Sequence, residues 1–359
     1  MRAAVIGTGA ISAQHLAFLS SSPRANLVGV CDLSPVSAKV AARRHDAGGS
    51  FTDAAAMLDI VNADVVHILT PPNSHGFLAR MALDHGAHVI CEKPMTATSD
   101  EAVALLNHAS LAKRHLVENH NYRFNDDVVT MHDNRVAGTI GTVREVEIRM
   151  ALPVRDPKGR FADENLPNAI HKMPAGVIHD VLTHMVYLLN HLSDHATWDT
   201  VSATWSNHGG GDLFKVDDLD TVLVGHHANG SVHGRLRFSA QTSPDSFGII
   251  VRGSEGQMST DLFHPFLDIR KARAVGSQLT PIANHVVNGA SLARAGFRNF
   301  GQKLLQHSPY HGLARFLDET YTAFAAGTTP PVTPRDIITA AQLIDRMVGQ
   351  MRLTQGATQ

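Results

Sequence analysis

The chain has 359 residues, 43% of them hydrophobic, which suffices for about two domains of ~150 residues each and excludes a disordered protein. Its formal net charge is -2 and it has no run of like charges, so we expect no nucleic acid or membrane partner. No leader-like segment precedes the first predicted strand, and no apolar stretch of membrane-spanning length occurs. We therefore expect a cytoplasmic protein, with Cys31 and Cys91 as reduced core thiols.

The first twenty residues predict a strand, a glycine turn and a helix. Residues 3–6 form a short apolar run that ends at Gly7, and apolar residues then recur at helical spacing over 11–19. Gly7 permits a sharp turn, and Gly9 lacks the Cβ that would keep a pyrophosphate away from the helix N-terminus. Ser12 stands where the dinucleotide-binding fingerprint has its third glycine.

A second predicted strand, 26–31, ends at Asp32, twenty residues after Ser12. A carboxylate there would accept hydrogen bonds from the ribose hydroxyls of NAD. The alternative is an ordinary α/β turn followed by a surface aspartate. The helix predicted over 35–45 carries three basic residues that could contact the 2′-phosphate of NADP: Lys39, Arg43 and Arg44. Because Asp32 would repel that phosphate, we expect NAD and keep NADP as the alternative.

Two further predicted strands are each followed by polar residues. Strand 63–70 stops at a pair of prolines, and strand 88–91 is followed at once by Glu92, Lys93 and Pro94. Residues beyond the carboxyl ends of strands in an open α/β sheet face the ligand crevice. Segments 70–75 and 92–94 should therefore border the cofactor. The remaining elements expected in this half are helices 54–60, 74–85 and 99–114 and strand 115–118.

From about residue 142 the pattern changes to alternating strands, which predict one antiparallel sheet. The expected strands are 142–151, 200–207, 221–227, 231–239 and 247–253. Before the second of them lies an apolar helix, 176–189, in which Asp180 and His184 share one face at i,i+4 spacing. They form either a pair suited to proton chemistry or a satisfied pair in a core helix. The insertion 152–175 is a lid or a solvated loop.

Five motifs occur in order: Gly7-Thr8-Gly9-Ala10-Ile11, Thr70-Pro71-Pro72-Asn73-Ser74-His75, Cys91-Glu92-Lys93-Pro94, Asn121-Tyr122-Arg123-Phe124 and Asp180-Val181-Leu182-Thr183-His184. Together they resemble the glucose-fructose oxidoreductase and inositol dehydrogenase family, Gfo/Idh/MocA. The chain departs from the family in having no glycine between Asp180 and His184, and in having Asp126 where a proline is usual. Both departures concern the substrate more than the reaction.

The expected fold is α/β plus α+β. An N-terminal Rossmann domain with a doubly wound parallel sheet, 1–121, precedes a substrate-binding and oligomerisation domain, 122–333, with a largely antiparallel open sheet covered by helices on one face. The resemblance implies that a closing helix, 334–351, packs back on the first domain. Burial of an open apolar sheet face predicts a homodimer or homotetramer. Segment 284–311 belongs clearly to neither domain and could be an arm.

The resemblance implies an NAD(P)-dependent dehydrogenase acting on a secondary alcohol of a sugar, cyclitol or nucleotide sugar. Lys93 and His184 would flank the reacting carbon, with His184 removing the hydroxyl proton, Lys93 holding the alkoxide and Asp180 supporting them. The expected cofactor contacts are Gly7, Gly9, Ala10, Ile11, Asp32, Thr70, Pro71, Asn73, His75, Glu92 and Lys93. The expected substrate contacts are Tyr122, Arg123, Tyr310 and His311.

Three alternatives remain. The substrate could be a diol or imine, since the fold does not fix the function. The protein could also be a ligand sensor or co-regulator that binds NAD(P) without turnover, although a sensor needs no positioned base. A metal centre at His179, Asp180 and His184 is disfavoured, because adjacent helical residues point about 100° apart and no third convergent ligand is evident. We expect no metal.

Overall fold

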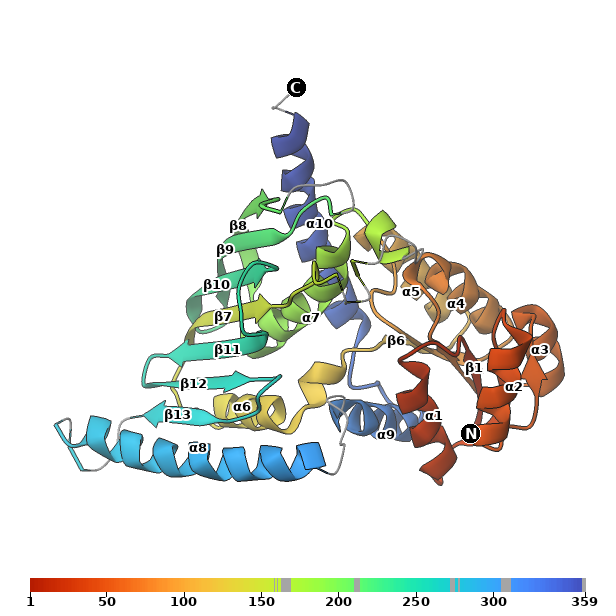
Figure 1. Cartoon of the computed structure of the whole chain (residues 1–359), viewed down its shortest axis with the longest axis horizontal. Coiled ribbons are helices and arrows are strands. Elements are labelled where there is room, and N and C mark those ends of the chain that lie inside the picture. The colour runs from red at the N-terminus through yellow and green to blue at the C-terminus, as the bar shows by residue number, and fades with distance from the viewer. Residues whose placement is uncertain are drawn as a thin grey trace. The chain divides into compact units, whose positions relative to one another are not determined.

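The structure is a computed structural model. It describes residues 1–157, 159, 161–162, 169–209, 214–271, 275–276, 278–304 and 311–356. The chain divides into two compact units. Figure 1 labels helices and strands of the chain. Unit 1 comprises Met1–Phe124 and Tyr310–Gln342, and unit 2 comprises Asn125–Pro309 and Leu343–Gln359. Each unit has its own sheet and is described by itself.

The sheet of unit 1 is six-stranded and fully parallel, with strand order β3-β2-β1-β4-β5-β6. Its strands are β1 (Arg2–Ile6), β2 (Asn26–Cys31), β3 (Ser50–Phe51), β4 (Val65–Ile68), β5 (His88–Cys91) and β6 (Leu116–Glu118). This is the strand order of the doubly wound dinucleotide-binding fold, in which the order of successive strands across the sheet reverses between β1 and β4 while all strands stay parallel. The predicted Rossmann sheet is confirmed.

Five helices of unit 1 follow the strands as the apolar spacing predicts: α1 (Ser12–Ser21), α2 (Pro35–Arg44), α3 (Ala54–Val61), α4 (His75–Asp84) and α5 (Ser99–Leu111). Unit 1 also contains α9 (His311–Ala326), which is not among the predicted helices, and the short 3-10 turns η1 (Pro72–Ser74) and η2 (Asn121–Phe124). Side-chain caps define the N-termini of α2, α3 and α5, since Ser34, Asp53 and Thr98 each accept a hydrogen bond from a first-turn backbone N–H. α9 packs on α1 and η2.

The sheet of unit 2 is seven-stranded, with order β13-β12-β11-β7-β10-β9-β8. Its strands are β7 (Val143–Ala151), β8 (Thr197–Ser206), β9 (Asp218–His227), β10 (Gly230–Ser239), β11 (Ser246–Gly253), β12 (Gly256–Asp261) and β13 (Asp268–Lys271). Only the β10–β7 pair is parallel, so the predicted largely antiparallel sheet is confirmed. The sequence pattern does not indicate β13.

One face of this sheet is covered by α7 (Val177–Leu192), which packs on β7 and β10. Unit 2 also contains α6 (Asp126–Val136), η3 (Ala169–Lys172) and α8 (Thr280–Leu304) (Figure 1). Along β7, the buried Val146, Ile148 and Met150 alternate with charged residues, as the period of two in a half-covered strand requires. α7 and the sheet thus share the apolar core of this unit.

The opposite face of the sheet is charged, so the expectation of an apolar open face is wrong. Arg235 pairs with Asp220 across β10 and β9, and Glu147 lies between Arg149 and Arg252. Charged side chains are tolerated at these strand positions because they contact water and pair with opposite charges on neighbouring strands. An association through this face would therefore be largely electrostatic.

The last helix, α10 (Pro334–Gly356), begins among the residues of unit 1 and continues, from Leu343, among those of unit 2. Its later part binds the edge strand β8. The Gln350 side chain donates to the Val201 carbonyl at 2.7 Å and accepts from the Ala203 N–H at 2.7 Å. Gln350 thereby supplies the two hydrogen bonds that a neighbouring strand would make, which protects this edge from pairing with another chain.

Among the helices that the structure describes, none has the length and apolar character needed to cross a bilayer.

Candidate active site

The turn between β1 and α1 is built around two glycines with different roles. Gly7 has φ +98°, and a Cβ there would lie 2.8 Å from the backbone of Leu69 and of Thr70. Only glycine allows β4 to end this close to the turn. Gly9 is exposed, and a Cβ added to it would meet nothing within 4 Å. The first glycine therefore shapes the turn, and the second leaves open space beside the start of α1.

The Asp32 carboxylate is fixed at the end of β2. Its Oδ2 accepts hydrogen bonds from the Thr8 N–H at 2.8 Å and the Thr8 hydroxyl at 2.6 Å, and Oδ1 accepts from the Ser34 N–H at 2.9 Å. Partial burial raises the pKa of Asp32, but these hydrogen bonds outweigh it and hold the pKa below its ordinary value. Asp32 is therefore a charged, partly exposed acceptor beside the glycine turn.

The basic residues of α2 lie away from Asp32. Arg43 and Arg44 occupy the last turn of the helix, whose N-cap is Ser34. At 1.5 Å per residue, the last turn begins about 12 Å along the axis from that cap. Lys39 is exposed one turn into the helix. This placement leaves the negative Asp32 as the nearest fixed charge to the ribose position, which favours NAD over NADP.

The segments after β4 and β5 are tied together by His75. One ring nitrogen of this buried histidine lies 2.7 Å from the Thr70 carbonyl oxygen, and the other lies 2.8 Å from that of Pro94. The Thr70 hydroxyl bonds the Ser74 hydroxyl at 2.7 Å, while Pro71 and Asn73 are exposed. The two segments expected to border the cofactor therefore lie side by side at the carboxyl edge of the sheet.

The Glu92 carboxylate, directly before Lys93, is almost fully buried. It accepts hydrogen bonds from His15 Nε2 at 3.2 Å, from Asn119 Nδ2 at 2.5 Å and from the backbone N–H of Lys93 at 3.3 Å. Burial by itself raises the pKa of Glu92, but the His15 and Asn119 contacts and the Lys93 charge lower it below its usual range. An ionised, hydrogen-bonded carboxylate thus lies directly before the candidate lysine in the chain, and Lys93 itself is half-buried.

A chain of buried hydrogen bonds leads from Tyr321 on α9 to this carboxylate. The Tyr321 hydroxyl lies 2.9 Å from His67 Nε2, the two Nδ1 atoms of His67 and His15 are 2.8 Å apart, and His15 Nε2 faces Glu92. Burial, followed by the nearby His15, lowers the pKa of His67 well below 6.5, so its ring is neutral.

These contacts give every group of the chain a hydrogen-bond partner. His15 Nε2 donates to the Glu92 anion, and the neutral His67 ring uses one nitrogen as donor and the other as acceptor, toward His15 and the Tyr321 hydroxyl. The chain therefore stabilises the negative charge on Glu92, the residue directly before Lys93.

Asp180 and His184 lie on α7, in unit 2. Asp180 is 7% exposed, and His184 is half-buried, with its Nδ1 2.8 Å from the Tyr187 hydroxyl. Among the residues that the structure describes, no group of three or more His, Cys, Asp or Glu side chains is arranged to hold a metal.

The expected substrate contacts are placed only in part. Tyr122 is buried in η2, and the Arg123 guanidinium lies 3.4 Å from an Asp336 carboxylate oxygen and 3.4 Å from the Pro331 carbonyl. The positive charge of Arg123 is therefore neutralised by Asp336 within unit 1. A substrate contact by Tyr122 or Arg123 stays a prediction. Tyr310 and the side chain of His311 lie outside the described residues, as does part of the insertion 152–175.

Neither cysteine is suited to acid or nucleophilic chemistry. Both Cys31 and Cys91 are free and buried, which confirms the prediction of core thiols. Burial, with the nearby Asp53 and Asp32 carboxylates, raises the pKa of Cys31 to about 11, and burial raises that of Cys91 as well. Both stay protonated thiols at neutral pH.

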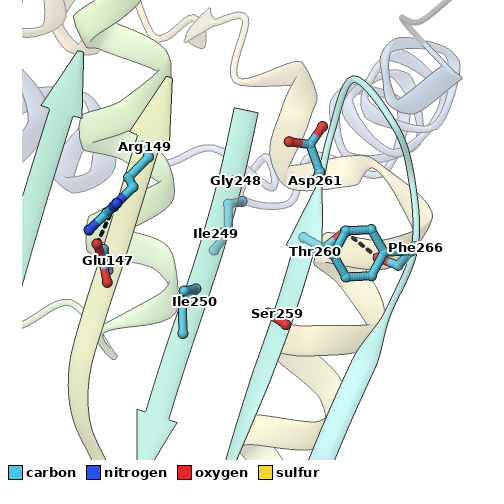
Figure 2. A pocket seen from close by; sticks show the side chains of 9 residues that line it. All are labelled: Glu147, Arg149, Gly248, Ile249, Ile250, Ser259, Thr260, Asp261 and Phe266. Carbon is cyan, nitrogen blue, oxygen red and sulfur yellow. Dashed lines mark hydrogen bonds and ion pairs between the residues drawn. The ribbon is translucent and has the colours of Figure 1, made fainter. Parts of the chain in front are cut away.

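A pocket of about 260 Å³ lies on the charged face of the sheet of unit 2, away from α7 (Figure 2). It is centred on Gly248, which pairs with Arg149 on one side and with Asp261 on the other. The missing side chain of Gly248 leaves the hollow between these two charged neighbours. The pocket therefore results from the glycine in β11, and it contains none of the predicted site residues.

The sequence pattern does not reveal the three members of the buried chain. His15 and His67 stand at positions that the apolar pattern assigns to the core, and Tyr321 is far away in sequence. The available signal is the presence of a histidine inside each of two apolar runs, because an imidazole is buried only where both nitrogens find partners.

The residues present fit a dinucleotide at the carboxyl edge of unit 1. Gly9 and Ala10 are exposed, and no side chain caps the start of α1, so a pyrophosphate can approach the backbone at this turn. Asp32 has used three of its roughly four acceptor positions, which leaves one for a ribose hydroxyl. A bound NAD would be held by these residues.

Comparison with known proteins gives the same assignment. The model described as "Oxidoreductase family, NAD-binding Rossmann fold" matches residues 1–120, and the one described as "GFO/IDH/MocA C-terminal domain" matches residues 128–259. The Escherichia coli D-glucoside 3-dehydrogenase is 29% identical over 144 residues, which are 40% of this chain and only 41% of that protein. The Rhizobium meliloti inositol 2-dehydrogenase is 24% identical over 310 residues, covering 82% of this chain and 92% of that protein.

A solved structure shows the same fold. The WlbA dehydrogenase from Bordetella pertussis, in complex with NADH and UDP-GlcNAcA, has a TM-score of 0.74 at 17% identity, covering 98% of this chain and 96% of that chain. Both family models, which together match most of the chain, belong to the same family, and the geometry of unit 1 fits the cofactor that this family binds. The chain is a member of the Gfo/Idh/MocA oxidoreductase family and carries its NAD-binding Rossmann domain.

Proposed function

We propose that the protein is an NAD-dependent dehydrogenase that oxidises a secondary alcohol of a sugar, cyclitol or nucleotide sugar, or reduces the corresponding ketone. The observation that carries the proposal is the carboxyl edge of unit 1. There the glycine turn and the ionised Asp32 fit NAD. Lys93 follows β5, and its backbone N–H is held by the buried Glu92 carboxylate. A lysine so placed faces the ligand crevice of an open α/β sheet.

The proposed division of labour follows from the chemistry of alcohol oxidation. NAD, when bound, accepts the hydride with its electron pair at the nicotinamide ring. His184 takes the hydroxyl proton on Nε2 as the O–H bond breaks, while Tyr187 holds Nδ1 and orients the ring. Lys93 stabilises the alkoxide that develops before the carbonyl forms, and Asp180 supports both residues. Reduction of the ketone runs through the same steps in reverse.

The substrate class is supported by the named relatives. An inositol 2-dehydrogenase, a D-glucoside 3-dehydrogenase and a D-apiose dehydrogenase are similar in sequence, and a structural neighbour is named UDP-N-acetylglucosamine 3-dehydrogenase. These names share a secondary alcohol on a polyhydroxylated carbon skeleton. We therefore assign this protein a polyol or sugar substrate.

The catalytic roles are tested by two single variants, each with a matched control. We expect Lys93→Met and His184→Asn to lower kcat at least ~100-fold while NADH affinity changes little, since each removes a group that acts on the reacting atoms. Lys113→Met and His226→Asn, at exposed positions, should keep the wild-type kcat. Initial rates of nicotinamide reduction and a fluorescence titration with NADH give the two quantities. A kcat within a few-fold of wild type in either test variant would contradict the role of that residue.

A further inference from the structure

Helix α8 turns its polar side inward. The Asn284 side chain donates to the Lys271 carbonyl at 3.0 Å, the Ser291 hydroxyl donates to the Leu267 carbonyl at 3.2 Å, and the Asn299 side chain donates to the Pro265 carbonyl at 2.8 Å. These three residues recur at helical spacing, so they define the face of α8 that packs on the segment around β13 (Figure 1). A helix that covers a sheet normally turns apolar residues inward instead.

Large apolar side chains of the same segment are exposed: Leu279 (55%), Ile282 (59%), Val286 (68%), Val287 (48%), Leu292 (59%) and Phe297 (81%). Leu279, Ile282, Val286 and Phe297 recur at spacings of three, four and eleven residues, with the exposed Ala290 and Ala293 between the last two. We name the set of Leu279, Ile282, Val286, Ala290, Ala293 and Phe297 the outer stripe. It runs along a helix about 37 Å long, on the side opposite Asn284, Ser291 and Asn299, while Val287 and Leu292 flank it.

The charged residues of the segment that contains the outer stripe have one sign. No Asp or Glu occurs between Asp268 and Asp318, whereas this interval contains seven Lys or Arg residues. Of these, Arg270 pairs with Asp268, and Arg315 lies on α9 in unit 1. Lys271 and Arg294 are exposed in unit 2, and Arg294 lies one turn before Phe297, at the border of the outer stripe. An overall net charge of -2 conceals this local excess of positive charge. An apolar stripe bordered by basic residues is the pattern of helices that lie in a membrane interface.

A second copy of the chain fits the outer stripe less well. A two-fold interface through this patch would bring together two copies of the same helix, and both copies would contribute basic residues such as Arg294 to the contact. The segment has no acidic residue to neutralise them. An anionic lipid surface supplies both an apolar phase for the stripe and negative charge for its border.

We propose that α8 is a peripheral membrane anchor, which lies in the plane of an anionic phospholipid surface with the outer stripe inserted among the acyl chains and Arg294 among the headgroups. This differs from the expectation, based on net charge and the lack of a spanning stretch, that the protein has no membrane partner. Contact through one surface helix needs neither a spanning segment nor a basic protein overall.

Flotation of the full-length protein with lipid vesicles tests this. One vesicle sample contains phosphatidylcholine only, and the other contains phosphatidylcholine with phosphatidylglycerol. We expect flotation with the anionic vesicles, at least about tenfold less with neutral vesicles, and a decrease as salt rises. The variant Val286→Asp/Phe297→Asp should lose at least about tenfold in bound fraction. A matched variant, Ile60→Asp/Leu111→Asp, changes two equally exposed apolar residues outside α8 and should float as wild type does. Arg294→Gln should weaken binding to anionic vesicles only.

Three results would overturn the proposal. The wild type could fail to float with anionic vesicles, or Val286→Asp/Phe297→Asp could float as the wild type does. A drop in molar mass by light scattering in that variant, without lipid, would show that a second copy covers the outer stripe. The unfolding midpoint of each variant, which should stay near that of wild type because the changed side chains are exposed, separates loss of binding from loss of fold.

Discussion

At the scale of single residues, the Asp32 carboxylate decides between the two nicotinamide cofactors. Because hydrogen bonds from Thr8 and Ser34 keep it ionised, it would attract a ribose hydroxyl and repel a 2′-phosphate. We expect Asp32→Asn to weaken NADH about tenfold, which is ~1.4 kcal/mol, and to leave NADPH unchanged or tighter. Fluorescence titrations with both cofactors measure the ratio. Asp59→Asn, an exposed carboxylate on α3, is the control, and equal weakening of both cofactors would show that Asp32 does not face the ribose.

His67 makes folding stability depend on pH. Its pKa in the folded protein lies well below the value near 6.5 of an unfolded chain, so only the unfolded state takes up a proton as the pH falls below 6.5. The stability from neutral His67 is therefore fully present above pH ~6.5 and is lost below it, at up to about 1.4 kcal/mol per pH unit. Glu92, whose pKa is lowered, adds a loss only below its ordinary value of 4.5.

We expect His67→Gln, which keeps a donor and an acceptor but does not titrate, to flatten this dependence. Urea unfolding at about pH 7.5 and about pH 5 gives the slope, and the decrease in the free energy of unfolding should be smaller in the variant than in wild type. His226→Gln, at an exposed position, should keep the wild-type slope. An unchanged slope in His67→Gln would show that His67 is not held neutral.

The sequence identifies single functional residues only where they belong to a recognisable motif. Gly7 and Asp32 can be found because the spacing of a glycine turn and an acid after the next strand reflects the geometry of one ligand. The donor chain through His15 and His67 cannot, because it joins residues from α1, β4 and α9 whose proximity arises only on folding. Burial of each histidine is predictable, but its partner is not.

At the scale of elements, α10 completes the edge of the sheet in unit 2. We expect Gln350→Ala to lower the free energy of unfolding by about 1–2 kcal/mol, because the Ala203 N–H and the Val201 carbonyl lose the partner that both share. Gln342→Ala, at an exposed position of the same helix, controls for helix propensity and should change stability by less than about 0.5 kcal/mol. Chemical denaturation measures both. Equal effects of the two substitutions would show that Gln350 does not close the edge.

Strands and helices with a clear period are predictable from the sequence. Five of the parallel strands of unit 1 are short apolar runs, and their bounds differ from the expected ones by a few residues. β3 and β13 are not indicated, because strands of two and four residues at a sheet edge carry no usable period, and no strand is expected over β12 either. The orientation of α8 is not indicated either, since the pattern of an amphipathic helix does not say which face packs on the protein.

At the scale of the whole molecule, the open face of the sheet in unit 2 gives a testable expectation for assembly. We predict a homodimer or homotetramer, with the paired charges of this face and the exposed Val222 and Val224 of β9 as its contact. Light scattering should give two or four times the mass of the chain. Arg235→Glu, which places like charges beside Asp220, should lower that mass, whereas His226→Gln on the same strand pair should not. A monomeric wild type would contradict the prediction.

The division of the chain into two units separates the proposed roles. The cofactor residues and Lys93 belong to unit 1, and Asp180 and His184 belong to unit 2. The order of patterns along the chain predicts a parallel α/β part followed by an antiparallel part, but it does not predict that Tyr310–Gln342 belongs to unit 1. The substrate cannot be predicted from the domain architecture, since proteins with the same fold have different binding pockets.

The most direct test of the account is transfer of deuterium from substrate to cofactor. Polyols, aldoses and nucleotide sugars carrying deuterium at each carbinol carbon are incubated with the protein and NAD, and the reduced cofactor is analysed by mass spectrometry. We predict deuterated NADH with at least one substrate, and its loss in Lys93→Met although NADH still binds. Binding of NAD with no reduction by any substrate in the panel, or formation of NADH at the wild-type rate in Lys93→Met, would contradict the proposed dehydrogenase.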